Sequence, residues 1–290
     1  MNGLLILDKP AGMTSHDVVA IVRRVTGERS VGHLGTLDPM ATGVLPLLLG
    51  KYTRLAQFFG AAEKSYTGTI RFGWGTDTFD AEGERAGEAV ALGLGLEELR
   101  VLAKHFQGEM DQMPPVFSAK KIGGVPAHKL ARAGKEVPVK AARITIQEFA
   151  LTGLEGDCAS FVMRVSAGGY VRSVAHELGG LAGCGAHLAS LRRTRAGVFG
   201  LEHAITVEEL KAMSVAEVEA RLPHPRGLLV EMPSVMVDEQ TAGKIRNGVQ
   251  VNVAEFSGAA LVKVFAGPRE LLCVAKRVAG TLVQPVVVMG

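Results

Sequence analysis

The sequence has few cysteines and no long apolar run, and these absences exclude several classes of protein. Its three cysteines, Cys158, Cys184 and Cys273, stand too far apart for a CxxC metal knuckle. They are also too few for a disulfide framework in a chain of 290 residues, so we expect reduced, buried thiols. No apolar stretch approaches membrane-spanning length, and the opening residues show no signal-peptide pattern. We therefore expect a cytoplasmic protein without a membrane partner.

Net charge is small, but the charges are unevenly distributed. The formal net charge is +3, whereas residues 118–143 carry seven basic residues against one acid. Arg192, Arg193 and Arg195 form a second basic cluster, and residues 77–98 are acidic. A basic face suits a polyanion, because phosphate contacts supply most of the affinity for nucleic acid. Solvated loops explain the same charges equally well.

The hydrophobic pattern predicts mixed helices and strands without a regular βαβ period, which favours an α+β fold. Ser15 stands where a helix N-cap is expected, and the helix that follows should end at Gly27. Further helices are expected at 96–106, 171–181 and 207–212, and strands at 4–7, 44–49, 64–72, 144–151 and 161–165. Prolines and a glycine within 222–233 predict a linker. Beyond it only short strands are expected, at 261–265, 270–275 and 282–289.

One segment, residues 32–46, places an acid inside a glycine-rich turn between two apolar stretches. Pro39 restricts Asp38 to extended backbone geometry, and Gly35 and Gly43 would permit close approach of a ligand. Such a turn can hold one carboxylate rigidly in a cleft. The simpler interpretation is an Asp-Pro turn in which Asp38 bonds its own backbone.

The string GHLGTLDPMATGVLP at 32–46 closely resembles the catalytic motif of the TruB family of bacterial tRNA pseudouridine synthases. Other motifs similar to those of the family follow in the same order along nearly the whole chain. They are KPAGMTS at 9–15, KSY at 64–66, GTDTFDAEG at 75–83, MPP at 113–115 with SAKK at 118–121, GGYVRS at 168–173, and GCGAHL at 183–188 leading to LRRTR at 191–195.

The resemblance implies a pseudouridine synthase fold over residues 1–225, with a mixed, mostly antiparallel sheet. Within it, residues 118–143 would grip the T-stem loop of tRNA, and residues 226–290 would form a small β-rich, PUA-like RNA-binding domain. The implied reaction converts the uridine at position 55, in the T loop, into pseudouridine. The bond from ribose C1′ to N1 breaks, the base rotates, and C5 joins C1′. No cofactor, metal or protein partner is implied.

The resemblance also implies roles for individual residues. Asp38 would be the catalytic carboxylate, acting covalently or by moving a proton through a glycal-type intermediate. Arg172 would pair with Asp38 and keep it ionised despite burial; otherwise it is a surface arginine at a helix start. Residues that would bind the substrate are Tyr66, Tyr170, Leu191, His33 and Lys9.

Three of these residues have plainer interpretations from the sequence alone. Tyr66 lies on the apolar face of its strand and would otherwise be a core aromatic, whereas the resemblance implies that it stacks on the target base. Leu191 would be ordinary packing in most proteins. His33 could support the RNA where the uridine leaves the stack, or could simply be a structural hydrogen-bond donor.

The chain departs from the family pattern at Ala167 and Gly169, at His128, and at His176–Gly179, where a more acidic pair is usual. These departures concern RNA grip and loop ordering, not the carboxylate chemistry.

Three other functions are compatible with the sequence. One is a guide-RNA-dependent pseudouridine synthase that acts on ribosomal RNA with partner subunits. Another is a non-catalytic RNA-binding or RNA-folding protein that uses the same basic face. The third is metal-dependent hydrolysis, because clustered carboxylates can hold Mg²⁺. The carboxylates in question are Asp77, Asp80, Glu82 and Glu84. Their spacing fits no calcium loop, and a solvated acidic loop is the better explanation of them.

Overall fold

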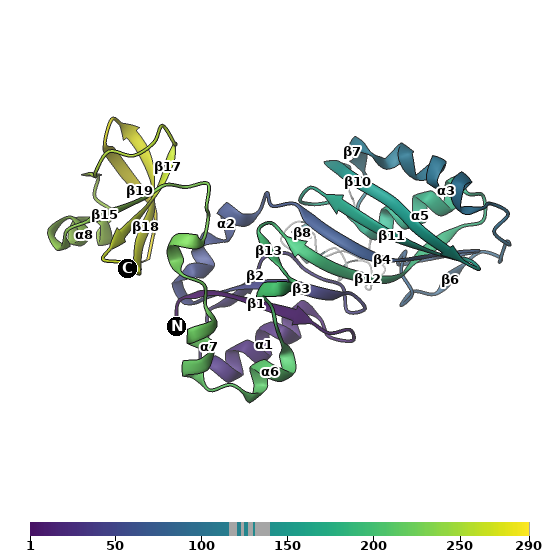
Figure 1. The fold of residues 1–290 in the computed structure, drawn as a ribbon, viewed down its shortest axis with the longest axis horizontal. Coiled ribbons are helices and arrows are strands. Elements are labelled where there is room, and N and C mark those ends of the chain that lie inside the picture. The colour runs from purple at the N-terminus through teal and green to yellow at the C-terminus, as the bar shows by residue number, and fades with distance from the viewer. Residues whose placement is uncertain (116–120, 123–124, 127–129, 131–139, 290) are drawn as a thin grey trace.

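The computed structural model describes residues 1–115, 121–122, 125–126, 130 and 140–289 (Figure 1). The strands of the main sheet are β1 (Gly3–Lys9), β2 (Val31–His33), β3 (Thr42–Leu49), β4 (Lys64–Phe72), β7 (Gly108–Gln112), β10 (Ala142–Glu155), β11 (Cys158–Val165), β12 (Ala186–Ala196), β13 (Phe199–Gly200) and β14 (Ile205–Thr206). They lie in the order β14–β1–β3–β12–β4–β11–β10–β7, with β2 on β3 and β13 on β12. Among these strands, β1 with β14 and β3 with β12 pair in parallel, and the other pairs are antiparallel. The prediction of a mixed, mostly antiparallel α+β sheet is confirmed.

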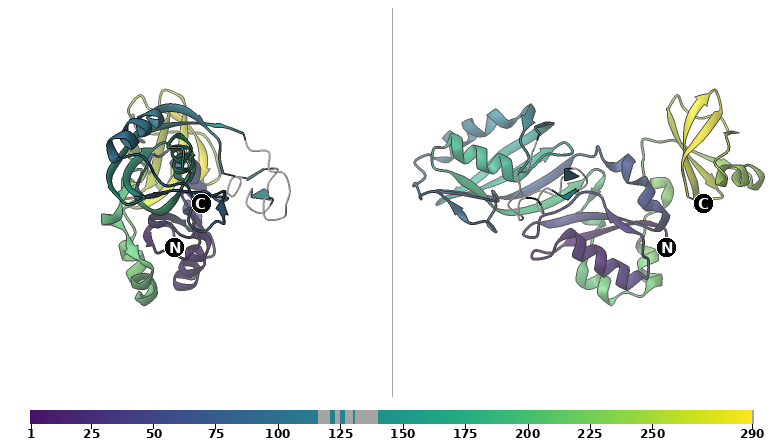
Figure 2. Two further views of the ribbon diagram at one scale, coloured as in Figure 1. Left: turned by 90° about the vertical axis from the view of Figure 1, so that its right-hand side faces the viewer. Right: turned by 180° about the vertical axis from the view of Figure 1, so that it is seen from behind.

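Helices cover the two ends of this sheet in separate groups (Figure 2). Beside β1 and β3 lie α1 (Ser15–Thr26), α6 (Val207–Ala212) and α7 (Val215–Arg221). Against β10 to β12 lie α3 (Leu96–Ala103) and α5 (Val171–Leu181). Short connecting elements are α2 (Ala56–Phe59), the 3-10 turns η1 (Gly50–Leu55), η2 (Lys104–Phe106), η3 (Leu201–His203) and η4 (Pro225–Gly227), and the two-residue strands β5 (Gly75–Thr76), β6 (Arg85–Ala86), β8 (Lys121–Ile122) and β9 (Val125–Pro126).

The continuous apolar runs of β1 and β3 are explained by burial of both faces. Alternate residues of a strand point to opposite faces. Leu5 and Leu7 of β1 join the core that α1 and α6 cover, whereas Leu4 and Ile6 point into a second core. That second core takes Leu228 from the linker and Phe265, Leu271, Val274, Val287 and Met289 from the C-terminal domain. The second core therefore links one face of β1 and β3 to the C-terminal domain.

The C-terminal domain is a five-stranded sheet with one helix. Its strands are β15 (Ser234–Val237), β16 (Val251–Asn252), β17 (Leu261–Ala266), β18 (Glu270–Ala279) and β19 (Leu282–Val288), in the order β15–β17–β18–β19–β16. The three strands expected from the sequence are confirmed, but α8 (Glu239–Arg246) shows that the expectation of strands alone was wrong. Asp238 caps α8 by accepting a hydrogen bond from the Thr241 backbone. The domain boundary at residue 225 stays a prediction.

Other differences from the sequence-based expectations are local. The N-cap of α1 is Thr14, not Ser15, because Thr14 and Asp17 form a reciprocal capping box. The helix expected at 96–106 changes to a 3-10 turn after Ala103. Cys184 and Cys273 are buried as expected, but Cys158 is only half-buried. Strand β12 has no counterpart in the predicted elements.

The predicted basic segment, residues 118–143, lies mostly outside the described residues. Of its basic residues, the described part includes Lys140 and Arg143, and Arg143 pairs with Glu109 at 2.9 Å. In the described part of the chain, no helix is long and apolar enough to cross a membrane.

Gly43 is required by the backbone of β12 rather than by a ligand. Its φ is +103°, and a Cβ there would lie 2.1 Å from the Arg193 carbonyl oxygen and 2.8 Å from its backbone nitrogen. At this point β3 lies between two strands, and Gly43 pairs with Arg193 of β12 on one side and with Lys9 of β1 on the other. The expectation that Gly43 makes room for a ligand is therefore wrong.

Gly43→Ala is expected to lower the free energy of unfolding by at least about 2 kcal/mol more than Gly12→Ala, because overpacking adds to backbone strain. Gly12 is a matched control, since its φ is +79° but a Cβ there meets nothing within 4 Å. Urea unfolding of both variants measures the difference. Equal losses would mean that strain alone selects glycine at position 43.

Candidate active site

Five of the seven predicted site residues line one cavity of about 300 Å³. They are Asp38, Tyr66, Tyr170, Arg172 and Leu191. Lys64 and Arg193 line it too, together with residues 35–37, 168, 169 and 171. His33 and Lys9 lie outside it. The cavity thus brings together the turn after β2, the strands β4 and β12, and the first turn of α5.

Arg172 connects two carboxylates from distant parts of the chain. Its Nε lies 2.9 Å from Asp38 Oδ2, and its Nη2 donates to Asp38 Oδ1 at 3.1 Å. Its Nη1 donates to Asp80 Oδ2 at 3.1 Å and to the Thr78 carbonyl at 3.0 Å. The predicted pairing of Arg172 with Asp38 is present, and Arg172 is a buried side chain rather than a surface arginine.

Asp38 differs from Asp80 in how much of it remains accessible. Asp80 is buried at 4% side-chain exposure, whereas the Asp38 side chain keeps 33% of its surface exposed. A carboxylate has about four lone-pair directions, and the arginine fork uses one on each oxygen of Asp38. The remaining lone pairs of Asp38 are available to a group that enters the cavity.

The turn that carries Asp38 is held from two sides. The buried Ser15 hydroxyl donates to the Leu37 carbonyl at 3.1 Å and accepts from the Leu37 amide at 2.9 Å. Arg193 Nη2 donates to the Gly35 carbonyl at 3.1 Å. Leu37 itself packs in the core. Asp38 therefore stands on a braced turn, not on a loose Asp-Pro loop.

Lys9 supports this turn and does not face the cavity. Its fully buried ammonium donates to the carbonyls of Pro10 at 2.8 Å, Met13 at 2.6 Å and Pro39 at 3.1 Å. Burial lowers the pKa of Lys9 to about 8, although the nearby Asp38 acts in the opposite direction. The expectation that Lys9 contacts the substrate is wrong for this structure, because all three of its donors are used internally.

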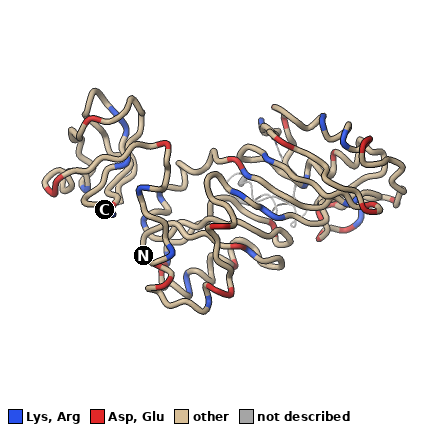
Figure 3. The backbone as a smooth tube through the Cα atoms, viewed as in Figure 1, with Lys and Arg blue, Asp and Glu red and all other residues tan. Residues whose placement is uncertain are grey.

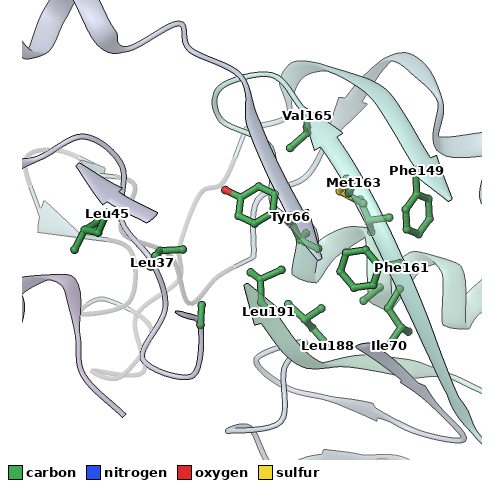
Figure 4. Close-up of a cluster of buried hydrophobic side chains, with 14 of the residues drawn as sticks. Leu37, Leu45, Tyr66, Ile70, Phe149, Phe161, Met163, Val165, Leu188 and Leu191 are labelled. Atoms are coloured by element: carbon green, nitrogen blue, oxygen red, sulfur yellow. The ribbon is translucent and has the colours of Figure 1, made fainter. Parts of the chain in front are cut away.

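Tyr66 and Leu191 form the apolar wall of the cavity. They lie on the neighbouring antiparallel strands β4 and β12, and each is less than one-tenth exposed. Figure 4 shows the Tyr66 ring at the edge of the core, its hydroxyl pointing away from Phe161 and Leu188. The ring of Tyr66 therefore packs in the core and also lines the cavity, and its stacking on the target base stays a prediction.

Tyr170 is positioned through its backbone. The buried Gln112 side chain accepts from the Tyr170 amide at 2.7 Å and donates to the Tyr170 carbonyl at 3.0 Å. Three residues after Tyr170, in the first turn of α5, the Ser173 hydroxyl donates to the Met113 carbonyl at 3.0 Å. These bonds fix the helix start that carries both Tyr170 and Arg172.

His33 ends β2, immediately before the turn, and is half-buried. Burial lowers its pKa, and the positive charge of Arg193 adds to this effect, so the neutral ring is favoured. Within the described residues its buried Nδ1 has no hydrogen-bond partner. The structural interpretation of His33 as a hydrogen-bond donor through Nδ1 therefore has no acceptor here.

The geometry agrees with comparisons to known proteins. Residues 23–171 match the model described as the TruB family pseudouridylate synthase N-terminal domain. This chain belongs to the TruB family. Residues 172–231 match a second model, described as the tRNA pseudouridylate synthase B C-terminal domain. The prediction of a TruB-type pseudouridine synthase, an isomerase, is confirmed.

Individual relatives extend this match over the whole chain. Proteins described as tRNA pseudouridine synthase B from Solibacter usitatus and Thermobifida fusca are 44% and 40% identical, respectively. Each alignment covers all of this chain and at least 99% of the relative. The solved structure of a Cbf5–Nop10–Gar1 complex aligns with 99% of this chain and 85% of its own, at a TM-score of 0.71 and 26% identity. The predicted pseudouridine synthase fold is confirmed.

In this TruB-family site, sequence analysis missed the structural roles of Asp80, Arg193 and Gln112. Asp80 was grouped with an acidic loop, yet it is buried and bonded to Arg172, Thr78 and the Glu82 amide. Asp80 lies in the GTDTFDAEG motif and Arg193 in the LRRTR motif, so the resemblance to the family marked both positions. Gln112 precedes the MPP motif and carried no signal of its own.

Among the described residues, no group of three or more His, Cys, Asp or Glu side chains could hold a metal ion.

Burial is the largest influence on Asp38 and raises the pKa of its carboxyl above the ordinary value. The positive charge of Arg172 lowers this pKa, the negative charge of Asp80 raises it, and Lys9 lowers it. Arg172 thus acts in the direction that the sequence predicts, but it does not cancel the effect of burial.

Arg172→Gln is expected to raise the pKa of Asp38 further, because the guanidinium that lowers it is lost while Asp80 remains. A ¹³C-carboxyl NMR titration measures this shift. Arg192→Gln is the matched control, since Arg192 pairs with Asp8 at 2.6 Å outside the cavity. An unchanged Asp38 pKa in Arg172→Gln would show that the arginine does not tune this carboxyl.

Lys9→Met is expected to lower the free energy of unfolding by about 3 kcal/mol, because three carbonyls lose their donor. Urea unfolding measures the loss. Lys51→Met serves as the control, since Lys51 is exposed on η1. The interpretation of Lys9 as a support for the turn would be contradicted if both variants unfolded at the same urea concentration.

Proposed function

We propose that this protein converts the T-loop uridine of tRNA at position 55 into pseudouridine, with Asp38 as the catalytic carboxylate. The observation that carries the proposal is the accessible Asp38 carboxylate, held by the Arg172 fork in a cavity with an apolar wall. The tRNA substrate is supported by the names of the relatives.

Asp38 is the reactive group in the proposed isomerisation. Its free lone pairs can attack ribose C1′ as the C1′–N1 bond breaks, or can accept a proton on the route through a glycal. Both routes need an ionised carboxylate in the resting enzyme. Arg172 stabilises that state and fixes the plane of the carboxylate, so that little reorganisation is needed when the substrate enters.

Tyr66 and Leu191 hold the base while it turns. A uracil that has lost its bond to C1′ must stay beside the sugar, and a flat apolar wall permits rotation without a fixed set of hydrogen bonds. A cavity of about 300 Å³ is at the lower end of the volumes that accept small molecules, which suits one nucleotide. Tyr170 closes the cavity at the start of α5.

A uridine inside folded RNA must leave its stack to reach this cavity. His33 precedes the turn that carries Asp38, and its ring is favoured in the neutral form. It is therefore suited to stack in the gap that the uridine leaves.

We expect basic side chains around the cavity, together with the C-terminal domain, to bind the RNA. Basic positions along β4 and β12 lie toward the middle of the molecule, whereas acidic positions gather around β6 (Figure 3). Residues 118–143 would add contacts to the T-stem loop. The PUA-like domain would hold the acceptor end of the tRNA.

A guide- and partner-dependent enzyme is the second candidate. The likeness to a Cbf5 chain that was solved together with Nop10 and Gar1 favours it. The full-length relatives described as tRNA pseudouridine synthase B favour an enzyme that acts on tRNA.

Purified protein alone is expected to release tritium from C5-labelled uridine in an unmodified tRNA transcript, and the product should map to the T loop. Asp38→Asn should reduce the rate at least about a thousandfold, because a neutral amide can serve neither as the nucleophile nor as the proton acceptor. Its affinity for tRNA should change little, since the amide keeps the shape of the side chain.

Asp157→Asn is the matched control, because Asp157 pairs with Arg71 at 3.1 Å outside the cavity. Release only after addition of a guide RNA or partner proteins would favour the second candidate. Full activity of Asp38→Asn would refute the catalytic role, and chelator-sensitive RNA cleavage would point to metal-dependent hydrolysis instead.

A further inference from the structure

A residue with a strained backbone, Phe79, lies between Thr78 and Asp80, which both bind Arg172. Phe79 has a φ of +64°, and among the described residues only Leu229 is another non-glycine with positive φ. This left-handed conformation is unfavourable for a residue with a bulky side chain. Such strain persists only where the surroundings determine it.

The backbone of Phe79 is tied to the turn and to β12. Its amide donates to the Thr76 carbonyl at 3.2 Å, and its carbonyl accepts from the Leu188 amide at 3.0 Å. On the side-chain end, its ring stacks on the His176 ring, with the centroids 3.8 Å apart and the planes 15° apart. The turn is thereby joined to β12 through its backbone and to α5 through a ring.

Phe79 stands between two residues that both bind Arg172. Here the Thr78 carbonyl and the Asp80 carboxylate both reach Arg172 Nη1, at 3.0 and 3.1 Å. The left-handed backbone of Phe79 therefore lies between two residues whose acceptors meet at one atom.

His176 connects this turn to α5 at a second point. It follows Arg172 by four residues in the same helix, so the two side chains lie on one face, one turn apart. The turn therefore contacts α5 through hydrogen bonds to Arg172 and through ring stacking on His176. Two contacts fix the orientation of the turn against the helix, which a single contact would not.

We propose that the stack of Phe79 on His176 is a positioning device, which sets the direction in which Arg172 presents its guanidinium to Asp38. Neither ring lines the cavity, so both are positioning residues. The inference deepens the proposed function and rests on it, because the Asp38–Arg172 pair is its object.

Removal of either ring, in Phe79→Ala or His176→Ala, is expected to lower kcat on the tRNA transcript about tenfold. A tenfold change in rate corresponds to about the interaction free energy of one stacked aromatic pair. The KM for tRNA should change less than about twofold, because neither ring reaches the cavity. The pKa of Asp38, measured by ¹³C-carboxyl NMR, should rise as Arg172 moves away. The double variant should be no worse than either single variant.

Three further variants separate positioning from folding. Phe79→Gly removes the ring and the backbone strain together, so it should remain as stable as the wild type and still lose kcat. His176→Tyr keeps an aromatic ring on the helix and should retain the wild-type kcat within about twofold. His203→Ala is the matched control, because it removes a different contact between a histidine and a phenylalanine, the one with Phe199 in the second core.

Two outcomes would overturn the proposal. One is a wild-type kcat and Asp38 pKa in folded Phe79→Gly and His176→Ala proteins. The other is additive losses in the double variant, which would mean that the rings act independently. If the wild type is inactive on every tRNA transcript, the proposed function fails; the Asp38 pKa would still report on the stack.

Discussion

The fork of Arg172 between Asp38 and Asp80 is the interaction on which the site depends. A buried carboxylate without a cation beside it would tend to take up a proton, and a buried arginine without partners would be costly. Placing one cation between two acids satisfies all three groups through hydrogen bonds. One acid is fully enclosed and anchors the arginine, while the other keeps open lone pairs. The same pair of contacts therefore supplies both stability and an accessible oxygen.

The rest of the catalytic domain can be understood as support for the two ends of this fork. At the Asp38 end, Ser15 and Lys9 use buried hydrogen bonds to fix the turn against α1 and β1. At the Arg172 end, Gln112 fixes the backbone at the start of α5. The sheet joins the two ends, because β3 and β12 pair where Gly43 permits close approach. Both faces of β1 and β3 are buried in hydrophobic cores, and the second of these cores includes residues of the C-terminal domain.

Local patterns predicted elements well where one periodicity dominated. The alternation in residues 64–72 predicted β4, and the helix at 171–181 was predicted with its observed bounds. Strand β12 was missed because its second half, LRRTRA, is mostly charged and polar. Its arginines are accommodated by partners that lie far away in sequence: Arg192 by Asp8, and Arg193 by the carbonyls of Gly35 and Val44. A short amphipathic helix such as α8 was likewise obscured by its glycine and polar residues.

By itself, the sequence determined the fold class, the family, and the candidate acid with its arginine partner, because these depend on the types and the order of residues. Tertiary structure decided which predicted residues meet. It placed Lys9 behind the turn instead of in the cavity, turned Asp80 from a loop acid into the anchor of Arg172, and put the strained Phe79 against His176. The physical reason is that burial, pKa and hydrogen bonding are set by neighbours distant in sequence. Asp38 and Arg172 are separated by 134 positions, and only the folded sheet brings them within 3 Å.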